Sequence, residues 1–151
     1  MIRVNKISRD LFSSKNNVVS LGALNSTMID FICSIEPSLA SQLSPDAEIT
    51  FFENRIKHTE RHKDDFSSDI MFEICLEDIP DIIHAPDYIS IHPKKNSISF
   101  IKDYSQHVSV AVRISLDGKL SYRTMYPITD AQLQNYLNTG RAKRYNDSVE
   151  H

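Results

Sequence analysis

The stretch of sequence that decides the fold spans residues 108–126 and reads VSVAVRISLDGKLSYRTMY. Its first half alternates apolar side chains with small or polar ones, which is the pattern of a half-buried β-strand. Asp117-Gly118 is the dipeptide preferred in a two-residue type I′ turn, and residues 120–126 then return antiparallel to the first strand. The sequence therefore predicts a β-hairpin at the centre of the fold.

A two-residue turn would place Leu116 opposite Lys119 and would set every other pair of the hairpin, because side chains alternate between its two faces. The core face would carry the apolar residues Val110, Val112, Ile114 and Met125. The other face would carry a polar and aromatic platform made of Ser109, Arg113, Tyr122, Thr124 and Tyr126. Arg123 falls among the apolar residues in this register, so we expect it to reach out at the sheet edge or to lie at a bulge.

Helices are expected on the N-terminal side of the hairpin. Residues 1–46 look helical, and a helix that Ser26 can cap should end before Pro37. Residues 48–52 fit either a brief strand or the entry to the next helix. Mixed charges at helical spacing predict a helix over residues 53–65. Ser67 or Ser68 can cap the next helix, and Asp78 followed by Pro80 can open a short one that ends at His84.

Two further strands and a last helix complete the predicted fold. Residues 88–92 and 97–102 show a period of two, which predicts strands. Thr129 can cap the last helix and Gly140 lies just past its end, with a polar, frayed tail after it. The sequence thus predicts an α+β fold in which N-terminal helices pack on a four-stranded antiparallel sheet, with a C-terminal helix.

Bulk properties favour one soluble domain. The 151 residues are expected to form a single domain, with a helical lead over residues 1–45 and a core over residues 49–145. No window approaches the roughly 18 uninterrupted apolar residues that a membrane span needs, and the start lacks an apolar signal core. We therefore expect a cytoplasmic protein with no membrane association. In that compartment Cys33 and Cys75 would remain free thiols.

The distribution of charge keeps nucleic acid among the expected ligands. The net charge of −3 argues mildly against a nucleic-acid binder, since such domains usually carry a basic patch. Between residues 113 and 144, however, basic residues outnumber the two acids Asp117 and Asp130. The basic residues are Arg113, Lys119, Arg123, Arg141, Lys143 and Arg144. A local basic face on an acidic protein is therefore expected.

The pair His58 and His62 is the main candidate for chemistry. Four residues separate the two imidazoles, so they project from one face of the predicted helix. Imidazole titrates near neutral pH and can act as acid or base in RNA cleavage. The spacing also suits two zinc ligands, although no third ligand is obvious and Glu60 is one position late for the zincin motif His-Glu-x-x-His. Surface histidines without a role are the third interpretation.

Other polar residues are weaker candidates. Arg113, Thr124 and Tyr126 would share one face of the hairpin, as solvent-side residues of many hairpins do. Lys102 could add a charge beside them. His84, His92 and His107 are interpreted as structural or solvated, with His107 the likeliest exception because it begins the hairpin strand.

These residues together resemble a known family. The chain is similar to phage-associated nuclease domains of the barnase–EndoU–colicin–RelE-like fold in three places. These are the helix bearing His-x-x-x-His, the segment Ile79-Pro-Asp-Ile-Ile83 before Ala-Pro-Asp87, and the strand ending Arg123-Thr-Met-Tyr-Pro127. The similarity runs from about residue 49 to residue 145. It implies helices packed on a four-stranded antiparallel sheet and a metal-independent endoribonuclease with toxin or effector biology in phages and mobile elements.

The resemblance implies a set of site residues. His58 and His62 match the helix histidines, Arg113 matches a basic strand residue, and Thr124 and Tyr126 match hydroxyl positions on the final strand. The leading hypothesis is cleavage of RNA to a 2′,3′-cyclic phosphate without a cofactor, with the two histidines as acid and base. Arg113, with Lys102 or Arg123, would stabilise the phosphorane, and Tyr122 would help to bind the substrate. The expected partners are RNA and a cognate inhibitor or antitoxin protein.

Two alternatives remain open from the sequence. A non-catalytic interaction module derived from such a nuclease would bind a protein through its polar platform and the acidic region around Asp78 and Asp81. A metal-dependent hydrolase would use both histidines as ligands.

Overall fold

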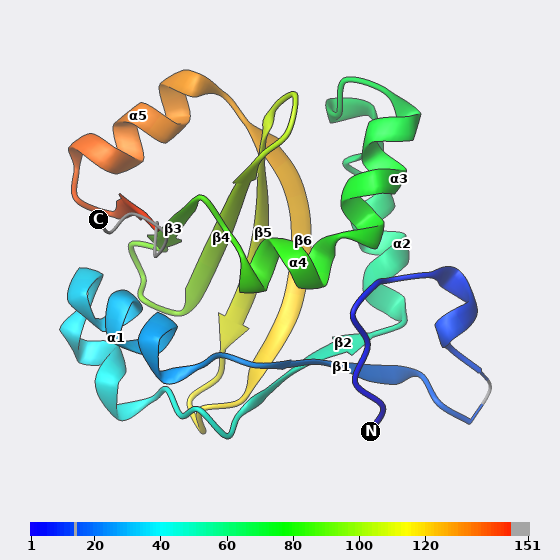
Figure 1. Ribbon diagram of the computed structural model, residues 1–151, viewed down its shortest axis with the longest axis horizontal. Helices are drawn as coiled ribbons and strands as arrows, with labels where there is room; N and C mark the ends of the chain where they lie inside the picture. The colour runs from blue at the N-terminus through cyan, green and yellow to red at the C-terminus, as the bar shows by residue number, and fades with distance from the viewer. Residues whose placement is uncertain (14, 146–151) are drawn as a thin grey trace.

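A seven-stranded mixed sheet forms the centre of the computed structural model, which describes residues 1–13 and 15–145 (Figure 1). The strand order is β1-β2-β6-β5-β4-β3-β7, and β2 pairs with β6 in parallel, whereas the other neighbours are antiparallel. The strands are β1 (Val18–Ala23), β2 (Glu48–Phe52), β3 (Tyr88–Ile91), β4 (Ser97–Asp103), β5 (His107–Ile114), β6 (Leu120–Ile128) and β7 (Ala142–Arg144).

The predicted four-stranded antiparallel sheet with N-terminal helices is therefore wrong. The four predicted strands are present as β3 to β6, but β1 and β2 extend the sheet on one side and β7 on the other. Strand β1 has consecutive buried residues and no alternation, because both of its faces are covered, so its sequence lacks the period of two. Of the two interpretations of residues 48–52, the strand is correct.

The helices are α1 (Ser26–Ile35), α2 (Asn54–Glu60), α3 (Asp69–Glu77), α4 (Ile79–His84) and α5 (Asp130–Asn138), with short 3-10 turns η1 (Arg9–Leu11), η2 (Pro37–Ser41) and η3 (Lys63–Asp65). Side chains cap the starts of α1, α3 and α5, whereas α2 and α4 begin without a side-chain cap, although Asp78 precedes α4 as expected. Ser68 caps α3, and Thr129 caps α5 in a reciprocal pair with Gln132, as the sequence predicts. Asn25 caps α1 in place of Ser26. The helix expected over residues 53–65 ends at Glu60, so His62 lies outside it, in the turn that precedes η3.

The tail expected to fray is partly ordered. Ala142–Arg144 pairs with β3 as the edge strand β7. The polar segment from residue 146 onward lies outside the described residues. No helix among residues 1–13 and 15–145 has the length and apolar character that crossing a bilayer requires.

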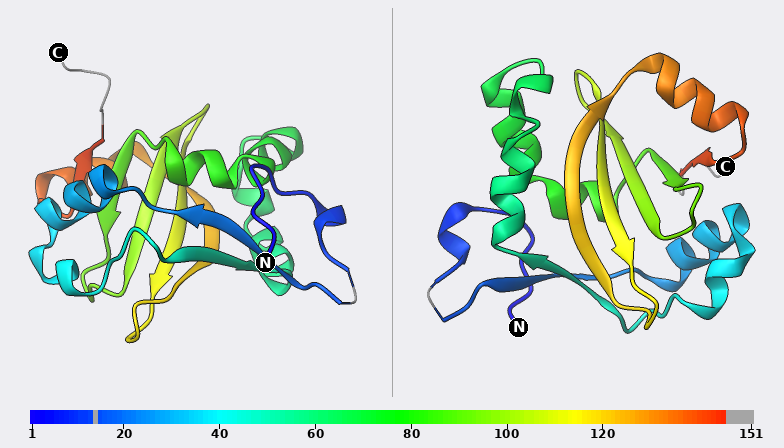
Figure 2. Two further views of the ribbon diagram at one scale, coloured as in Figure 1. Left: turned by 60° about the horizontal axis from the view of Figure 1, so that its bottom comes forward. Right: turned by 180° about the vertical axis from the view of Figure 1, so that it is seen from behind.

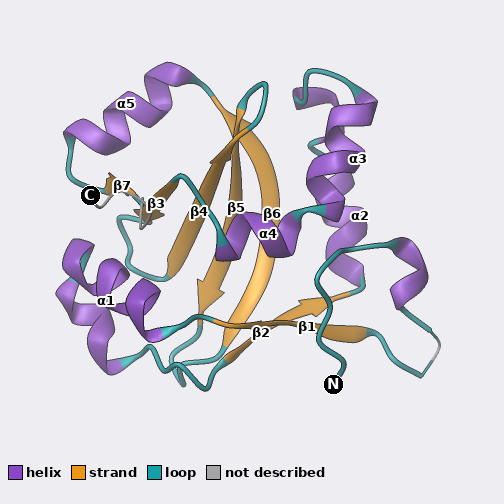
Figure 3. Cartoon of the chain, in the orientation of Figure 1, coloured by secondary structure: helices purple, strands orange, loops and turns teal. Residues whose placement is uncertain are grey.

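Helices cover the two faces of the sheet unequally (Figures 1 and 3). Side chains of α1, α3 and α4 pack on one face in the main hydrophobic core. On the opposite face, α5 packs through Leu133 over Ile101 and Ile128 in a smaller cluster. Seen from behind, no helix crosses the middle of this second face between α2 and α5 (Figure 2). We call it the open face, which carries Ser97, Ser99, Ala111, Arg113, Arg123, Thr124 and Tyr126.

The hairpin differs from its predicted register near the turn. Among the described non-glycine residues only Lys95 has a positive φ, so Asp117 is excluded from a type I′ turn, which needs positive φ at both central positions. Within this turn Gly118 is the residue in the left-handed conformation (φ 81°). Ser115 and Lys119 close a three-residue loop through a 2.9 Å backbone hydrogen bond. The extra loop residue shifts the pairs near the turn, so Val112 lies opposite Tyr122.

A β-bulge at Arg123 restores the predicted register farther along the hairpin. Ala111 lies opposite Thr124 and Ser109 opposite Tyr126, as the sequence predicts. A bulge was one of the two explanations considered for Arg123. It turns the Tyr122 side chain into the main core, where the Tyr122 ring stacks on the Phe51 ring with 4.5 Å between centroids. Full burial of such a ring contributes about 1.5–3 kcal/mol to folding.

Candidate active site

The bulge in β6 docks helix α2 beside the open face. The Arg123 carbonyl, at the point where the ladder is interrupted, accepts hydrogen bonds from Nε and Nη2 of Arg55 at 2.9 and 2.5 Å. The Tyr122 hydroxyl lies 2.5 Å from Oγ1 of Thr59, which is fully buried and donates to the Arg55 carbonyl at 2.7 Å. Since the Thr59 proton is used in that bond, the Tyr122 hydroxyl donates. Both contacts hold α2 against β6.

This docking brings His58 and His62 to the aromatic edge of the open face. The two imidazole centroids lie 6.4 Å apart, and the His62 ring lies 5.7 Å from the ring of Tyr126. Nδ1 of His62 lies 3.4 Å from a carboxylate oxygen of Asp65, in the 3-10 turn that follows. The predicted neighbours His62 and Tyr126 are therefore in contact, and Asp65 is an additional residue that the sequence analysis did not single out.

The surroundings of His58 are cationic. Partial burial lowers the pKa of His58 below its ordinary value, and the charges of Arg55, Arg61 and Arg123, together with His62, lower it further. All of these effects disfavour the imidazolium. At neutral pH His58 is therefore predominantly a neutral base.

A basic hollow lies on the open face beside Arg123. It has a volume of about 360 Å³ and contains Arg113 and Arg123 from the hairpin with Lys94 from the β3–β4 turn. None of these three side chains forms an ion pair or hydrogen bond with another residue of the described chain, and no acidic residue lines the hollow. Three unpaired cations in one concave site suit a phosphate group.

Thr124 lies on the same face, next to Arg123 in β6 and opposite Ala111 in β5. Its Oγ1 is buried and has no hydrogen-bond partner within residues 1–13 and 15–145. A buried hydroxyl without a partner is uncommon in folded proteins, because losing its bonds to water costs free energy. Thr124 is therefore a suitable donor for a ligand that reaches the floor of the face.

Two predicted substrate-binding residues lie away from this cluster. Tyr122 is 1% exposed in the main core, because the three-residue loop and the bulge reverse its direction. Lys102 alternates with Ile101 along β4 and therefore lies on the opposite face, where its Nζ donates to the Ala85 carbonyl at 2.8 Å. The structure thus brings together His58, His62, Arg113, Arg123, Thr124 and Tyr126, and separates Tyr122 and Lys102 from them.

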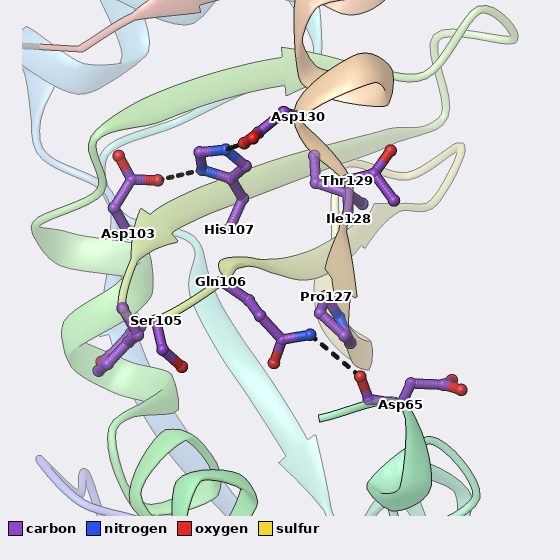
Figure 4. Close-up of a pocket in the computed structure, with 10 residues that line it drawn as sticks. Asp65, Asp103, Ser105, Gln106, His107, Pro127, Ile128, Thr129 and Asp130 are labelled. Atoms are coloured by element: carbon purple, nitrogen blue, oxygen red, sulfur yellow. Dashed lines mark hydrogen bonds and ion pairs between the residues drawn. The ribbon is translucent and has the colours of Figure 1, made fainter. Parts of the chain in front are cut away.

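A second cavity, of about 600 Å³, lies at the other end of β5 and β6 and contains His107 (Figure 4). Nδ1 and Nε2 of His107 lie 2.5 Å from carboxylate oxygens of Asp103 and Asp130. Burial would lower the pKa of His107, but the hydrogen bonds and charges of these two carboxylates outweigh it and raise the pKa. With Asp65 also in its wall, the cavity is acidic and is poorly suited to an anion.

The acidic region of the alternative interaction hypothesis is partly structural. Asp78 accepts a 3.0 Å hydrogen bond from the Tyr104 hydroxyl and lies 3.6 Å from Nζ of Lys6. Asp81 is exposed in α4. Asp78 is therefore committed to contacts within the fold, and a charge reversal there would disturb packing as well as any surface.

A metal site would need several His, Cys, Asp or Glu side chains close together. No group of three or more His, Cys, Asp or Glu side chains with suitable placement occurs in the described part of the chain. Cys75 is buried, and burial raises its pKa to about 12, so its thiol is a poor nucleophile.

Comparison with known proteins identifies one family. The sequence model described as phage-Barnase-EndoU-ColicinE5/D-RelE like nuclease3 matches residues 30–135, more than two-thirds of the chain. The match includes His58 in α2, His62 in the turn after it and the whole β5–β6 hairpin, and it leaves out β1 and β7. No curated protein and no solved structure matches the chain.

Proposed function

The chain belongs to the phage-Barnase-EndoU-ColicinE5/D-RelE like nuclease3 family, and on that premise we propose that it is a metal-independent endoribonuclease that leaves a 2′,3′-cyclic phosphate. Membership makes nucleic acid the substrate class and associates the chain with phages and toxin-like nucleases. The choice of RNA and of this chemistry is supported by one observation above all. Two imidazoles and two unpaired arginines, His58, His62, Arg113 and Arg123, lie around one open sheet face.

His58 is the proposed base. A neutral imidazole takes the proton from the 2′-hydroxyl, and the 2′-oxygen then attacks the neighbouring phosphorus. The cations around His58 keep it neutral, and they also attract the phosphate that brings the hydroxyl to it. The proton therefore leaves the nucleophile for a group that is free to accept it at neutral pH.

His62 is the proposed acid. As the bond from phosphorus to the 5′-oxygen breaks, that oxygen receives a proton from the His62 imidazolium, and the 2′,3′-cyclic phosphate remains on the other product. The Asp65 carboxylate can hold Nδ1 of His62 and leave Nε2 for the transferred proton. Tyr126, in contact with the same ring, limits its motion or stacks against a base.

Arg113 and Arg123 are the proposed electrostatic stabilisers. Charge on the non-bridging oxygens increases as the phosphorane forms, and a well-placed donor is worth about 3–4 kcal/mol at that point. Neither guanidinium is paired with an acid in the described chain, so neither must break an ion pair to bind phosphate. Thr124 Oγ1 can donate a further hydrogen bond from the floor of the face.

The biological context of the family extends the proposal. A toxin-like ribonuclease would act on RNA in the cytoplasm. An inhibitor protein that protects the producing cell would need to cover the open face, and acidic side chains would match the unpaired Arg113, Arg123 and Lys94.

The test is RNA integrity after incubation of purified protein with total RNA in EDTA. Wild type should cleave, and the variant His58→Ala/His62→Ala should not. Equal cleavage by both proteins would contradict the assignment of the site. Intact RNA with wild type, in EDTA and also with added divalent ions, would contradict nuclease activity and favour the interaction module. Cleavage only with added ions would contradict metal independence.

A further inference from the structure

A second hollow shares one lining residue, His92, with the basic hollow beside Arg113. The second one has a volume of about 440 Å³ and lies between the end of α1, the end of β3 and the end of α5. His92 lines both hollows and is the residue they share. A ligand that occupies both would pass His92 and would extend away from His58 and His62.

The second hollow has the chemistry of a base-binding site. The Arg141 guanidinium lies 4.0 Å over the ring of Tyr136, and its Nε donates to the Ile91 carbonyl at 3.0 Å, so its plane is held in one orientation. The amide of Asn135 lines the same hollow and can both donate and accept hydrogen bonds. Among the described residues that line it, the one acid is Glu36, which lies 3.5 Å from Nζ of Lys95. Planar guanidinium groups and amides are groups on which unpaired bases stack and hydrogen-bond.

His92 is a neutral donor between the two hollows. Its Nδ1 accepts a 3.0 Å hydrogen bond from the backbone N–H of Lys94, so the neutral ring carries its proton on Nε2. Burial lowers the pKa of His92, and the charges of Arg141 and Lys94 lower it further. At neutral pH the ring therefore offers one N–H to an oxygen of a passing ligand.

We propose that the two hollows are consecutive subsites for single-stranded RNA: the first binds the phosphate next to the scissile one at Lys94, and the second binds an unpaired base at Arg141. This inference rests on the proposed ribonuclease function and specifies its substrate class. A base in a duplex is held by its partner strand and cannot enter the second hollow. The substrate is therefore a single-stranded segment or loop that extends beyond the cleaved dinucleotide.

The test separates binding from cleavage. Fluorescently labelled, fully 2′-O-methylated oligonucleotides of two and six nucleotides cannot react, and fluorescence anisotropy gives their affinities. Wild type should bind the hexamer at least about tenfold more tightly than the dimer, because one further base and phosphate are bound. Lys94→Ala and Arg141→Ala should each reduce this ratio several-fold. A duplex of the same hexamer sequence should bind wild type more weakly than the single strand.

Lys119→Ala is the matched control. Lys119 is an exposed lysine at the tip of the β5–β6 hairpin and lies outside both hollows, so its removal should leave the length ratio unchanged. Lys94 lies in an exposed turn, and its replacement does not threaten folding. Cleavage of total RNA with a length ratio that neither variant reduces would overturn the two subsites and leave the proposed function intact. Wild type that neither binds nor cleaves RNA would overturn both.

Discussion

Two histidine environments beside the β5–β6 pair use the same side chain in opposite ways. His107 lies between the carboxylates of Asp103 and Asp130, which raise its pKa and favour its charged form. His58 lies among arginines, and burial together with these charges lowers its pKa. The first arrangement satisfies both ring nitrogens within the fold. The second leaves a neutral base beside three arginines and no carboxylate among the groups that shift its pKa.

The difference separates a structural histidine from the one that we propose as a catalytic base. His107 stabilises the fold, because its ion pairs connect the start of β5 to the first residue of α5. The placement of Arg113, Arg123 and Lys94 around one hollow does not stabilise the fold, since like charges repel. Perturbed pKa values that do not benefit the fold are typical of catalytic sites. The larger cavity, at His107, is therefore the less suitable active site.

The largest expected effect comes from His58→Gln. Loss of a general base should lower kcat on RNA by about 10²–10⁴-fold, while the free energy of unfolding should change by less than about 0.5 kcal/mol. His107→Gln is the matched control, and it should keep activity within a few-fold. Steady-state cleavage and denaturant unfolding of both variants test the comparison, which fails if His107→Gln loses more activity than His58→Gln.

Arg113→Gln should have the next largest effect. Removing one donor to the developing charge is expected to lower kcat by about 10²-fold, with a smaller change in KM. Lys119→Gln removes a cation at the hairpin tip and should change neither parameter measurably. Stopped-time cleavage assays over a range of RNA concentrations give both constants. An equal loss in the two variants would show that only general charge on the hairpin matters.

Thr59→Val should show what holds the histidines in place. It removes the buried hydroxyl that accepts from Tyr122 and should lower the free energy of unfolding by about 1–3 kcal/mol. Thr59→Ser keeps the hydroxyl and should lose much less. Activity should fall with Thr59→Val at temperatures where the protein is still folded, because α2 loses its anchor to β6. Thermal unfolding and cleavage rates of the two variants decide the outcome, and equal stability would contradict this role.

The smallest effect concerns the pH dependence of stability at His107. Its folded-state pKa is raised above the ordinary value of 6.5, so its contribution is fully present below that value and is lost as pH rises through the raised pKa. Because the Asp130 side chain is 94% exposed, we expect a contribution of less than about 1 kcal/mol. Denaturant unfolding at pH 6 and pH 9 should show a stability gap between wild type and His107→Gln that closes at the higher pH. A gap that widens with pH would contradict this sign.

Local patterns predicted the centre of the sheet but not its edges. Alternation in residues 108–114 and 120–126 was sufficient for β5 and β6, and period-two patterns were sufficient for β3 and β4. Strand β1 contains Gly22 at φ 84° and a run of buried residues, and β7 is three residues long. Neither carries a local signal of its own, because tertiary contacts decide their pairing.

The site was predicted in part for the same reason. The pairs Ala111–Thr124 and Ser109–Tyr126 follow from the hairpin pattern, and they place Thr124 and Tyr126 on the open face. Tyr122 was assigned to the wrong face, because Asp-Gly suggested a two-residue loop where the chain forms a three-residue one. Lys94 and His92 join the face through the β3–β4 turn, and Asp130 reaches His107 from α5. No sequence spacing reveals these long-range contacts.

The most direct measurement of the central claim is the chemical nature of the product ends. A short single-stranded RNA cleaved in EDTA should give fragments whose masses correspond to a 2′,3′-cyclic phosphate and a 5′-hydroxyl, and His58→Gln should give almost none. These ends arise only when the 2′-oxygen is the nucleophile. Fragments with a 5′-phosphate, or the same cyclic ends in equal yield from His58→Gln, would contradict the proposed chemistry at this site.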